Sequence, residues 1–238
     1  MKKIIYSISD EVFKQFPGYI RGIVLALNID NTATHPEINT MLRAAEESAR
    51  QSLTIEKLIE NPRINSWREA FRSFGAKPGK FRSSIEAMTR RALRNESLPS
   101  INPLVDIGNI LSLKYLVPTG GHALDDVTQD ISLRHATGKE EFIALGSDQI
   151  EHPIPGEIIF AEGNTVLTRR WSWRQANHTL TLPTTRSVEF NIDGLPPVPE
   201  DEVEKMCKEL IGLITKFCGG KIRYEILSRD NPSMILGE

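Results

Sequence analysis

The sequence predicts an α+β protein in which several helices precede a series of short strands. Four segments between residues 36 and 115 have helical composition or helical spacing of apolar residues. The β-rich segments between residues 131 and 192 are short and are separated by Gly, Pro or Asn. Because helices and strands are segregated along the chain, we expect a largely antiparallel or mixed sheet and no regular βαβ winding.

The first half of the chain contains two predicted strands and four predicted helices. The second helix starts after a break at Pro62, and the fourth has a capping residue, Asn102, followed by Pro103, which suits a first turn. We expect strands at residues 2–8 and 19–27, and helices at residues 36–58, 62–75, 82–94 and 103–115.

The second half begins with a Gly-rich segment, residues 118–122, that is expected to form a turn. Strands are predicted at residues 131–135, 141–145, 157–161, 166–170, 180–182 and 187–192. An amphipathic helix over residues 203–217 ends at Gly219-Gly220, and a last strand, residues 222–227, precedes a polar tail.

Composition indicates an ordinary globular protein. The chain has 238 residues, of which 39% are hydrophobic and 25% are charged. Its two cysteines, Cys207 and Cys218, are too few for a disulfide framework and favour a reducing compartment. The N-terminus turns polar at Ser7, and no stretch approaches the about 20 apolar residues of a membrane span. We therefore expect a cytoplasmic protein without a membrane partner.

Positive charge is concentrated in two segments although the net charge is only −2. Residues 72–94 contain seven basic residues and one acid, and residues 163–188 contain four arginines and no acid. Two interpretations are open: these residues contact phosphates, or they belong to solvated surfaces.

Several common kinds of active site have no motif in this sequence. There is no Gly-x-Gly-x-x-Gly, no phosphate-binding P-loop and no Gly-x-Ser-x-Gly. The five histidines are far apart, and no Cys-x-x-Cys occurs. Neither a metal nor a cofactor is expected.

Candidate site residues are densest between Asp106 and Asp126. His122 follows Gly120 and Gly121, and a histidine in a Gly-rich turn is accessible for proton transfer, with Asp125 or Asp126 placed to fix its tautomer. The alternative is purely structural: a tight turn in which these side chains cap neighbouring elements.

A second group of candidates lies in residues 168–175. Arginine pairs with phosphates, and tryptophan stacks on nucleic acid bases. The candidates here are Arg169, Arg170, Trp173 and Arg174. Alternatively, Trp171 and Trp173 face the core and the arginines face solvent. A third, weaker group consists of Glu157 and Glu162, which border a predicted strand.

Three segments together resemble a known family. They are residues 71–87 (FRSFGAKPGKFRSSIEA), residues 98–109 (LPSINPLVDIGN) and residues 169–174 (RRWSWR). They resemble solo proteins related to the tRNA-editing module of the phenylalanyl-tRNA synthetase beta subunit, the B-three/B-four domain. The resemblance runs from about Trp67 to Gly194 and implies a three-layer α+β fold with a β-sandwich of unusual topology.

The resemblance also implies roles for individual residues. Asn109 and His122 match positions that line the editing pocket, and Glu162, with Glu157 as second choice, is the candidate for a glutamate that recognises the misplaced amino acid. Gly108 stands where the synthetase has threonine, so the substrate amino acid can differ from tyrosine. A single domain is expected, with residues 67–194 as its editing-like core, residues 1–60 packed on it, and a C-terminal helix and strand in residues 199–227.

We expect a tRNA-binding protein that hydrolyses mischarged aminoacyl-tRNA in trans and does not aminoacylate. His122 would position or deprotonate water, Asp125 would orient it, and Asn109 with the N–H groups of Gly120 and Gly121 would hold the carbonyl oxygen. The expected contacts to the acceptor end come from Lys80, Arg82, Arg169, Arg170, Trp173 and Arg174. Two alternatives remain: a binding module that has lost the chemistry, and a hydrolase of small amino-acid esters.

Overall fold

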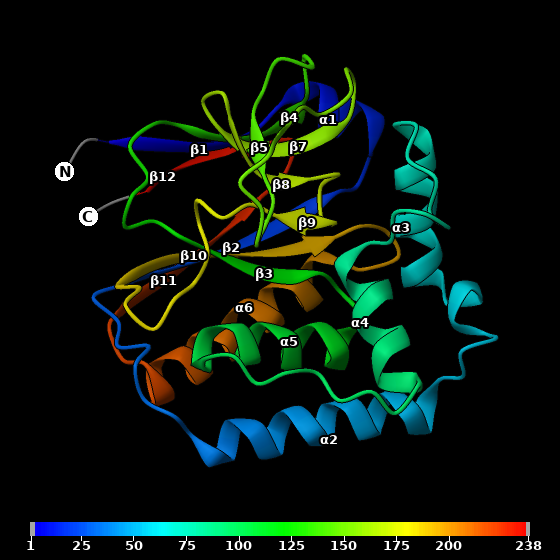
Figure 1. The fold of residues 1–238 in the computed structure, drawn as a ribbon, viewed down its shortest axis with the longest axis vertical. Coiled ribbons are helices and arrows are strands. Elements are labelled where there is room, and N and C mark those ends of the chain that lie inside the picture. Colours follow the sequence, from blue (N-terminus) through cyan, green and yellow to red (C-terminus); the bar gives the residue numbers. More distant parts are fainter. Residues whose placement is uncertain (1–2, 237–238) are drawn as a thin grey trace.

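The computed structural model describes residues 3–236, which fold into two stacked β-sheets with helices over one outer face (Figure 1). The larger sheet has six strands in the order β12-β1-β4-β7-β8-β9, and the smaller has four in the order β11-β2-β10-β3. The predicted α+β class is confirmed.

The six-stranded sheet is mixed. β1 runs parallel to β4, and all other neighbouring strands of this sheet pair antiparallel. Its strands are β1 (Ile4–Ile8), β4 (Ile131–His135), β7 (Ile158–Glu162), β8 (Thr165–Arg169), β9 (Arg174–Gln175) and β12 (Ser233–Leu236). The prediction for residues 2–8 thus corresponds to β1, and residue 2 lies outside the described residues.

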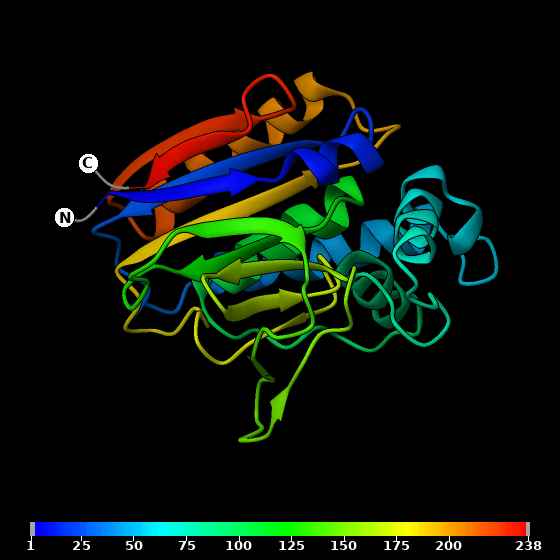
Figure 2. The same cartoon turned by 90° about the horizontal axis from the view of Figure 1, so that it is seen from above.

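The four-stranded sheet is antiparallel throughout. Its strands are β2 (Ile20–Leu27), β3 (Thr119–Ala123), β10 (Ser187–Gly194) and β11 (Lys221–Leu227). A separate hairpin of β5 (Phe142–Ile143) and β6 (Ile150–Glu151) projects from the body of the protein (Figure 2).

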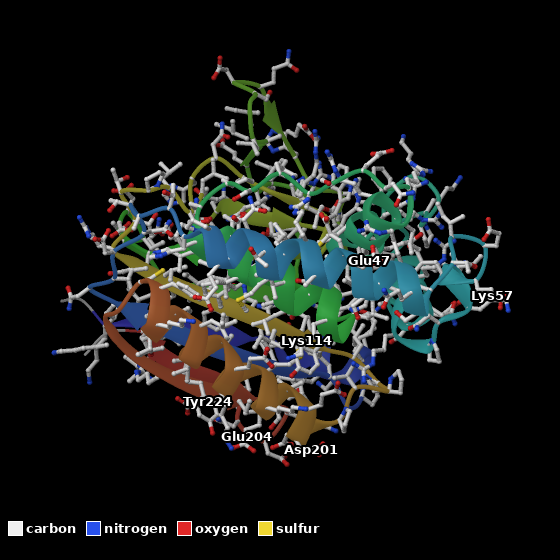
Figure 3. All side chains as sticks on the ribbon, turned by 90° about the horizontal axis from the view of Figure 1, so that it is seen from below. Glu47, Lys57, Lys114, Asp201, Glu204 and Tyr224 are labelled. Atoms are coloured by element: carbon white, nitrogen blue, oxygen red, sulfur yellow. The ribbon has the colours of Figure 1, made fainter. Side chains whose placement is uncertain are left out.

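Helices α5 and α6 cover the outer face of the four-stranded sheet, and α2 packs on the outside of α5 (Figure 3). Asn102 caps α5 through a hydrogen bond from the Val105 N–H, as predicted. The helices are α1 (Asp10–Gln15), α2 (Pro36–Ser52), α3 (Pro62–Ser73), α4 (Ser84–Leu93), α5 (Pro103–Tyr115) and α6 (Glu200–Phe217), and a 3₁₀ turn, η1, spans Leu58–Glu60.

Strand β10 separates two buried layers because its side chains alternate between its faces. Val188, Phe190 and Ile192 join the apolar core under α5 and α6. Glu189 and Asp193, with Asn191 between them, face the opposite way and are buried as well. The space between the two sheets therefore contains a polar layer, and this layer forms the base of the site described below.

Four secondary-structure predictions require correction. Residues 119–123 form strand β3 instead of a turn, because β10 supplies a pairing edge and the missing side chain of Gly121 leaves room for the Phe190 ring. The polar tail contains β12, whose Met234 and Leu236 alternate into the core beside β1. Residues 180–182 form no strand, and the helix predicted for residues 36–58 ends at Ser52.

Candidate active site

A cavity of about 250 Å³ lies where the edge of the four-stranded sheet meets the β8–β9 end of the six-stranded sheet. Helices α4 and α5 contribute its remaining walls. Apolar side chains form much of the wall, among them Met88, Leu104, Phe160, Trp173 and Phe190. Polar side chains from the layer between the sheets form the base: Arg21, His122, Thr168, Asn191 and Asp193.

His122 is the centre of a hydrogen-bonded chain in this base. The register of β3 and β10 places His122 directly opposite Glu189, and its Nδ1 lies 2.8 Å from the Glu189 Oε1. On the other side of the ring, Nε2 lies 2.8 Å from the Thr168 Oγ1. His122 is 6% exposed and Glu189 is 0% exposed.

The partners of the imidazole determine its tautomer. Two groups lie near Nδ1: the Glu189 carboxylate at 2.8 Å, which accepts, and the Asn191 Nδ2 at 3.2 Å, which donates and also reaches the Glu189 Oε1 at 3.3 Å. The shorter contact assigns the Nδ1 proton to the bond with Glu189, and the Asn191 amide then donates to the same carboxylate. Nε2 is then the acceptor for the Thr168 hydroxyl. This is the arrangement in which a histidine can remove a proton from a hydroxyl group, with a carboxylate behind it to stabilise the imidazolium ion.

A buried ion pair fixes the base of the cavity. Arg21 Nε donates to the Asp193 Oδ1 over 2.7 Å, and Arg21 Nη1 donates to the Tyr6 hydroxyl over 2.6 Å. Tyr6 in turn donates to the Asn191 side chain, and Tyr19 donates to Asp193. Burial raises the pKa values of both tyrosines well above their ordinary value, so they remain neutral donors.

β3 is the edge strand of its sheet, and its outer edge borders the cavity. Thr119, Gly121 and Ala123 direct their backbone groups away from β10, since their partners are Ser112 Oγ, Gln175 Nε2 and the Thr179 carbonyl. The Gly121 N–H lies on this edge, whereas alternation directs the Gly120 N–H toward β10. Gly121 is therefore the better placed of the two to hold a substrate oxygen.

Helix α5 contributes Asn109 and packs very closely on the sheet. A Cβ atom at Gly108 would lie 3.3 Å from the Phe190 ring, tighter than an ordinary contact. Glycine is therefore favoured at position 108, because any larger residue would press on the Phe190 ring. Asn109 lines the cavity, is half-buried, and makes no side-chain hydrogen bond within the described residues 3–236.

The cavity brings together six of the residues predicted from sequence. They are Asn109, Gly120, Gly121, His122, Trp173 and Arg174. The prediction that Asp125 orients His122 is wrong, because Asp125 is exposed and accepts a hydrogen bond from the Arg186 N–H. Glu189, which occupies that place instead, is 67 residues away in sequence.

Neither glutamate predicted to recognise the substrate lines the cavity. The Glu162 Oε1 accepts hydrogen bonds from the backbone N–H groups of Thr128 and Gln129, and its Oε2 contacts His178. Glu157 is buried in an ion pair with Arg169. Both carboxylates already have hydrogen-bond partners within the protein. The prediction that Glu162 or Glu157 recognises the substrate is therefore wrong.

The arginine–tryptophan segment divides between core and surface. Arg170 and Trp171 adopt left-handed backbone conformations, with φ of 47° and 63°, so β8 ends here and Trp171 turns into the core. Arg170 is buried, and its guanidinium lies 3.7 Å from the Phe81 ring centre and 4.3 Å from that of Trp173. Arg169 is also buried. The prediction that Arg169 and Arg170 contact tRNA is therefore wrong.

A second cavity, of about 380 Å³, adjoins the first and is lined largely by arginines of α4 and its ends. The two cavities share Met88. Its lining includes Arg82, Arg90, Arg91 and Arg94, with Glu96 as the single acid. We call this set of residues the arginine groove. Lys80 is exposed and lies two residues before Arg82, and the exposed Arg174 lines the first cavity.

Within residues 3–236 no three His, Cys, Asp or Glu side chains are grouped so as to hold a metal ion. No helix among the same residues has the length and apolar character needed to cross a membrane.

Comparison with known families fits this architecture. Residues 66–219 match the B3/4 domain family, about two thirds of the chain. The chain belongs to that family. The resemblance inferred from the sequence is thus confirmed, and the match extends beyond Gly194 through α6.

Among solved structures, an N-terminal fragment of the phenylalanyl-tRNA synthetase beta subunit from Pyrococcus horikoshii is similar at 13% identity with a TM-score of 0.46. The similarity covers 92% of this chain and 50% of that fragment, so the chain spans about half its length. Among curated proteins, none matches.

Proposed function

We propose that this B3/4 domain protein binds the acceptor end of a tRNA and hydrolyses the ester between a wrongly attached amino acid and the terminal ribose. The observation that carries the proposal is the Glu189–His122 pair in the base of the cavity. A histidine backed by a buried carboxylate can act as a general base, and this ring is largely buried.

The cavity contains the further groups that ester hydrolysis requires. The Gly121 N–H and the side chain of Asn109 are donors that border the cavity and would stabilise the negative charge that develops on the carbonyl oxygen. The ester bond is already activated, so holding it beside the base supplies a large part of the rate increase.

The arginine groove supports nucleic acid as the substrate class. Exposed guanidinium groups pair with phosphate oxygens, and Arg82, Arg91 and Arg94 are all exposed. Because the groove and the cavity share Met88, a chain of phosphates in the groove would lead its 3′ end to the cavity. Trp173 and Arg174 would contact the terminal nucleotide at the cavity wall.

A binding module without turnover is the second candidate, and one observation favours it. Both ring nitrogens of His122 already have protein partners, and the ring is almost fully buried. A module of this kind would bind tRNA with a steep salt dependence and would release no amino acid.

Deacylation of a panel of correctly and wrongly charged tRNAs tests the proposal. We expect the protein to release at least one mischarged amino acid and His122→Ala to lose about 100-fold or more of that activity. His135→Ala is the matched control, because its ring contacts Gln15 outside the cavity. Absence of release from every tRNA, with binding retained, would refute hydrolysis and favour the binding module.

Charge reversal tests the groove separately. Arg91→Glu combined with Arg94→Glu is expected to weaken tRNA binding at least about tenfold and to reduce its salt dependence. Lys205→Glu is the control, because Lys205 is exposed on α6 and lines neither cavity. Equal affinities for all three proteins would exclude the groove as the tRNA contact.

A further inference from the structure

We propose that the Thr168 hydroxyl is the nucleophile of the reaction and that catalysis passes through an acyl-enzyme ester on Thr168. This inference rests on the proposed function for its natural substrate. It differs from the sequence-based expectation, in which His122 acts directly on water.

The geometry around His122 leads to Thr168. The acceptor nitrogen of the imidazole, Nε2, is occupied by the Thr168 Oγ1 at 2.8 Å. A water molecule can reach this nitrogen only if Thr168 moves away. The group from which His122 is placed to remove a proton is therefore the threonine hydroxyl.

Thr168 is held in place and borders the cavity. It lies in β8, which pairs with β7 on one side and with β9 on the other, so its backbone is fixed from both edges. Thr168 is 8% exposed and forms part of the cavity lining. A substrate carbonyl in the cavity can thus be reached by the hydroxyl without movement of the strand.

Another hydroxyl in the same cavity lacks this activation. Ser172 also lines the cavity, but its buried Oγ has no hydrogen-bond partner within the described part of the chain. A serine hydroxyl without a neighbouring base is a weak nucleophile. Ser172 is therefore a natural control for Thr168.

The proposed reaction has two balanced steps. In the first, Thr168 Oγ bonds to the carbonyl carbon while its proton passes to His122 Nε2, and Glu189 stabilises the imidazolium ion. The oxyanion forms next to the Gly121 N–H. The bond to the ribose oxygen then breaks, and His122 returns the proton to that oxygen.

In the second step, water attacks the ester on Thr168 with His122 as the base. The amino acid leaves, and the threonine hydroxyl is regenerated. The sum of both steps is one ester and one water converted to one amino acid and one free tRNA end, with no other reactant.

The first experiment measures single-turnover deacylation by three variants. Thr168→Val preserves the shape of the side chain without the hydroxyl, Thr168→Ser retains a hydroxyl, and Ser172→Ala removes the control hydroxyl. We expect Thr168→Val to lose at least about 100-fold in rate, and the other two variants to stay within about tenfold of the wild type. Urea unfolding of each variant verifies that it is folded.

The second experiment searches for the intermediate with a small probe, the p-nitrophenyl ester of an N-protected aromatic amino acid. After an acid quench, mass spectrometry of the intact protein and its peptides is expected to show one acyl group on Thr168. The adduct should be absent from Thr168→Val and present on Ser172→Ala.

The outcomes distinguish this inference from the proposed function. Hydrolysis of aminoacyl-tRNA that persists in Thr168→Val, with no adduct on the wild type, would overturn the nucleophile and leave the proposed function standing. An adduct on Thr168 from the probe, with no release from any tRNA, would support the nucleophile and refute the proposed substrate.

Discussion

The buried pair of Arg21 and Asp193 is expected to be essential for stability, and Arg21→Met tests this. The two side chains are 1% and 6% exposed, and Arg21 donates two hydrogen bonds to the carboxylate. Removing one partner of a buried pair leaves an uncompensated charge and typically costs about 3 to 5 kcal/mol. Tyr19 and Trp171 still donate to Asp193, so we expect about 3 kcal/mol, the lower end of that range.

Urea unfolding monitored by circular dichroism measures this loss. The second variant, Arg21→Met with Asp193→Asn, removes the stranded charge and is expected to recover about 1 to 2 kcal/mol. Lys216→Met is the control, because Lys216 and Glu37 form an exposed pair, 54% and 56% exposed, whose loss costs at most about 1 kcal/mol. A loss below about 1 kcal/mol for Arg21→Met would refute the reasoning.

Three further predictions concern access to the cavity and titrating groups. Gly120→Val is expected to abolish deacylation without destabilising the fold, because nothing lies within 4 Å of a Cβ there; Gly121→Ala, crowded by Phe190 at 3.2 Å, should instead lower stability by about 1 to 3 kcal/mol. Burial alone would raise the pKa of Glu140, but hydrogen bonds from Thr137 and a guanidinium lower it from 4.5 to about 2. Its contribution to stability is thus complete above about pH 4.5 and lost toward pH 2, and Glu140→Gln should flatten acid unfolding curves in that range. Burial raises the pKa of Cys207 to about 12, so the native protein should resist iodoacetamide at pH 8, and rapid alkylation there would contradict this.

Local sequence signals predicted the helices well. The break at Pro62, the cap at Asn102 and the apolar spacing in α6 are properties of neighbouring residues, and the structure reproduces them. The strand β3 was missed because its two glycines and preceding proline are typical of a turn. Its strand conformation depends on β10, which lies far away in sequence, and such long-range pairing leaves no local signal.

The partner of His122 could not be found for a related reason. Glu189 belongs to a strand in which polar and apolar residues alternate, and alternation ordinarily indicates one face in solvent. Here both faces are buried, since the six-stranded sheet covers the polar one. Closeness in sequence favours Asp125 as the partner of His122, but proximity across a strand pair determines the contact instead.

The basic residues show what a charge count omits. Residues 72–94 are rich in positive charge, and several of them form the arginine groove. Arg169 is equally basic but serves as the partner of Glu157, and Arg170 packs between aromatic rings. Which arginine reaches the surface depends on the backbone conformation at Arg170 and Trp171, and no sequence pattern predicts that conformation.

The most direct test of the central claim, that the cavity holds the aminoacyl end of a tRNA, is a crystal structure with an unreactive analogue. A 3′-aminoacylamino adenosine carries an amide in place of the ester and cannot be released easily. We predict that its carbonyl carbon lies about 3 to 3.5 Å from Thr168 Oγ, with the carbonyl oxygen toward the Gly121 N–H. An analogue bound outside the cavity, or a cavity that remains empty at saturating concentration, would contradict the account.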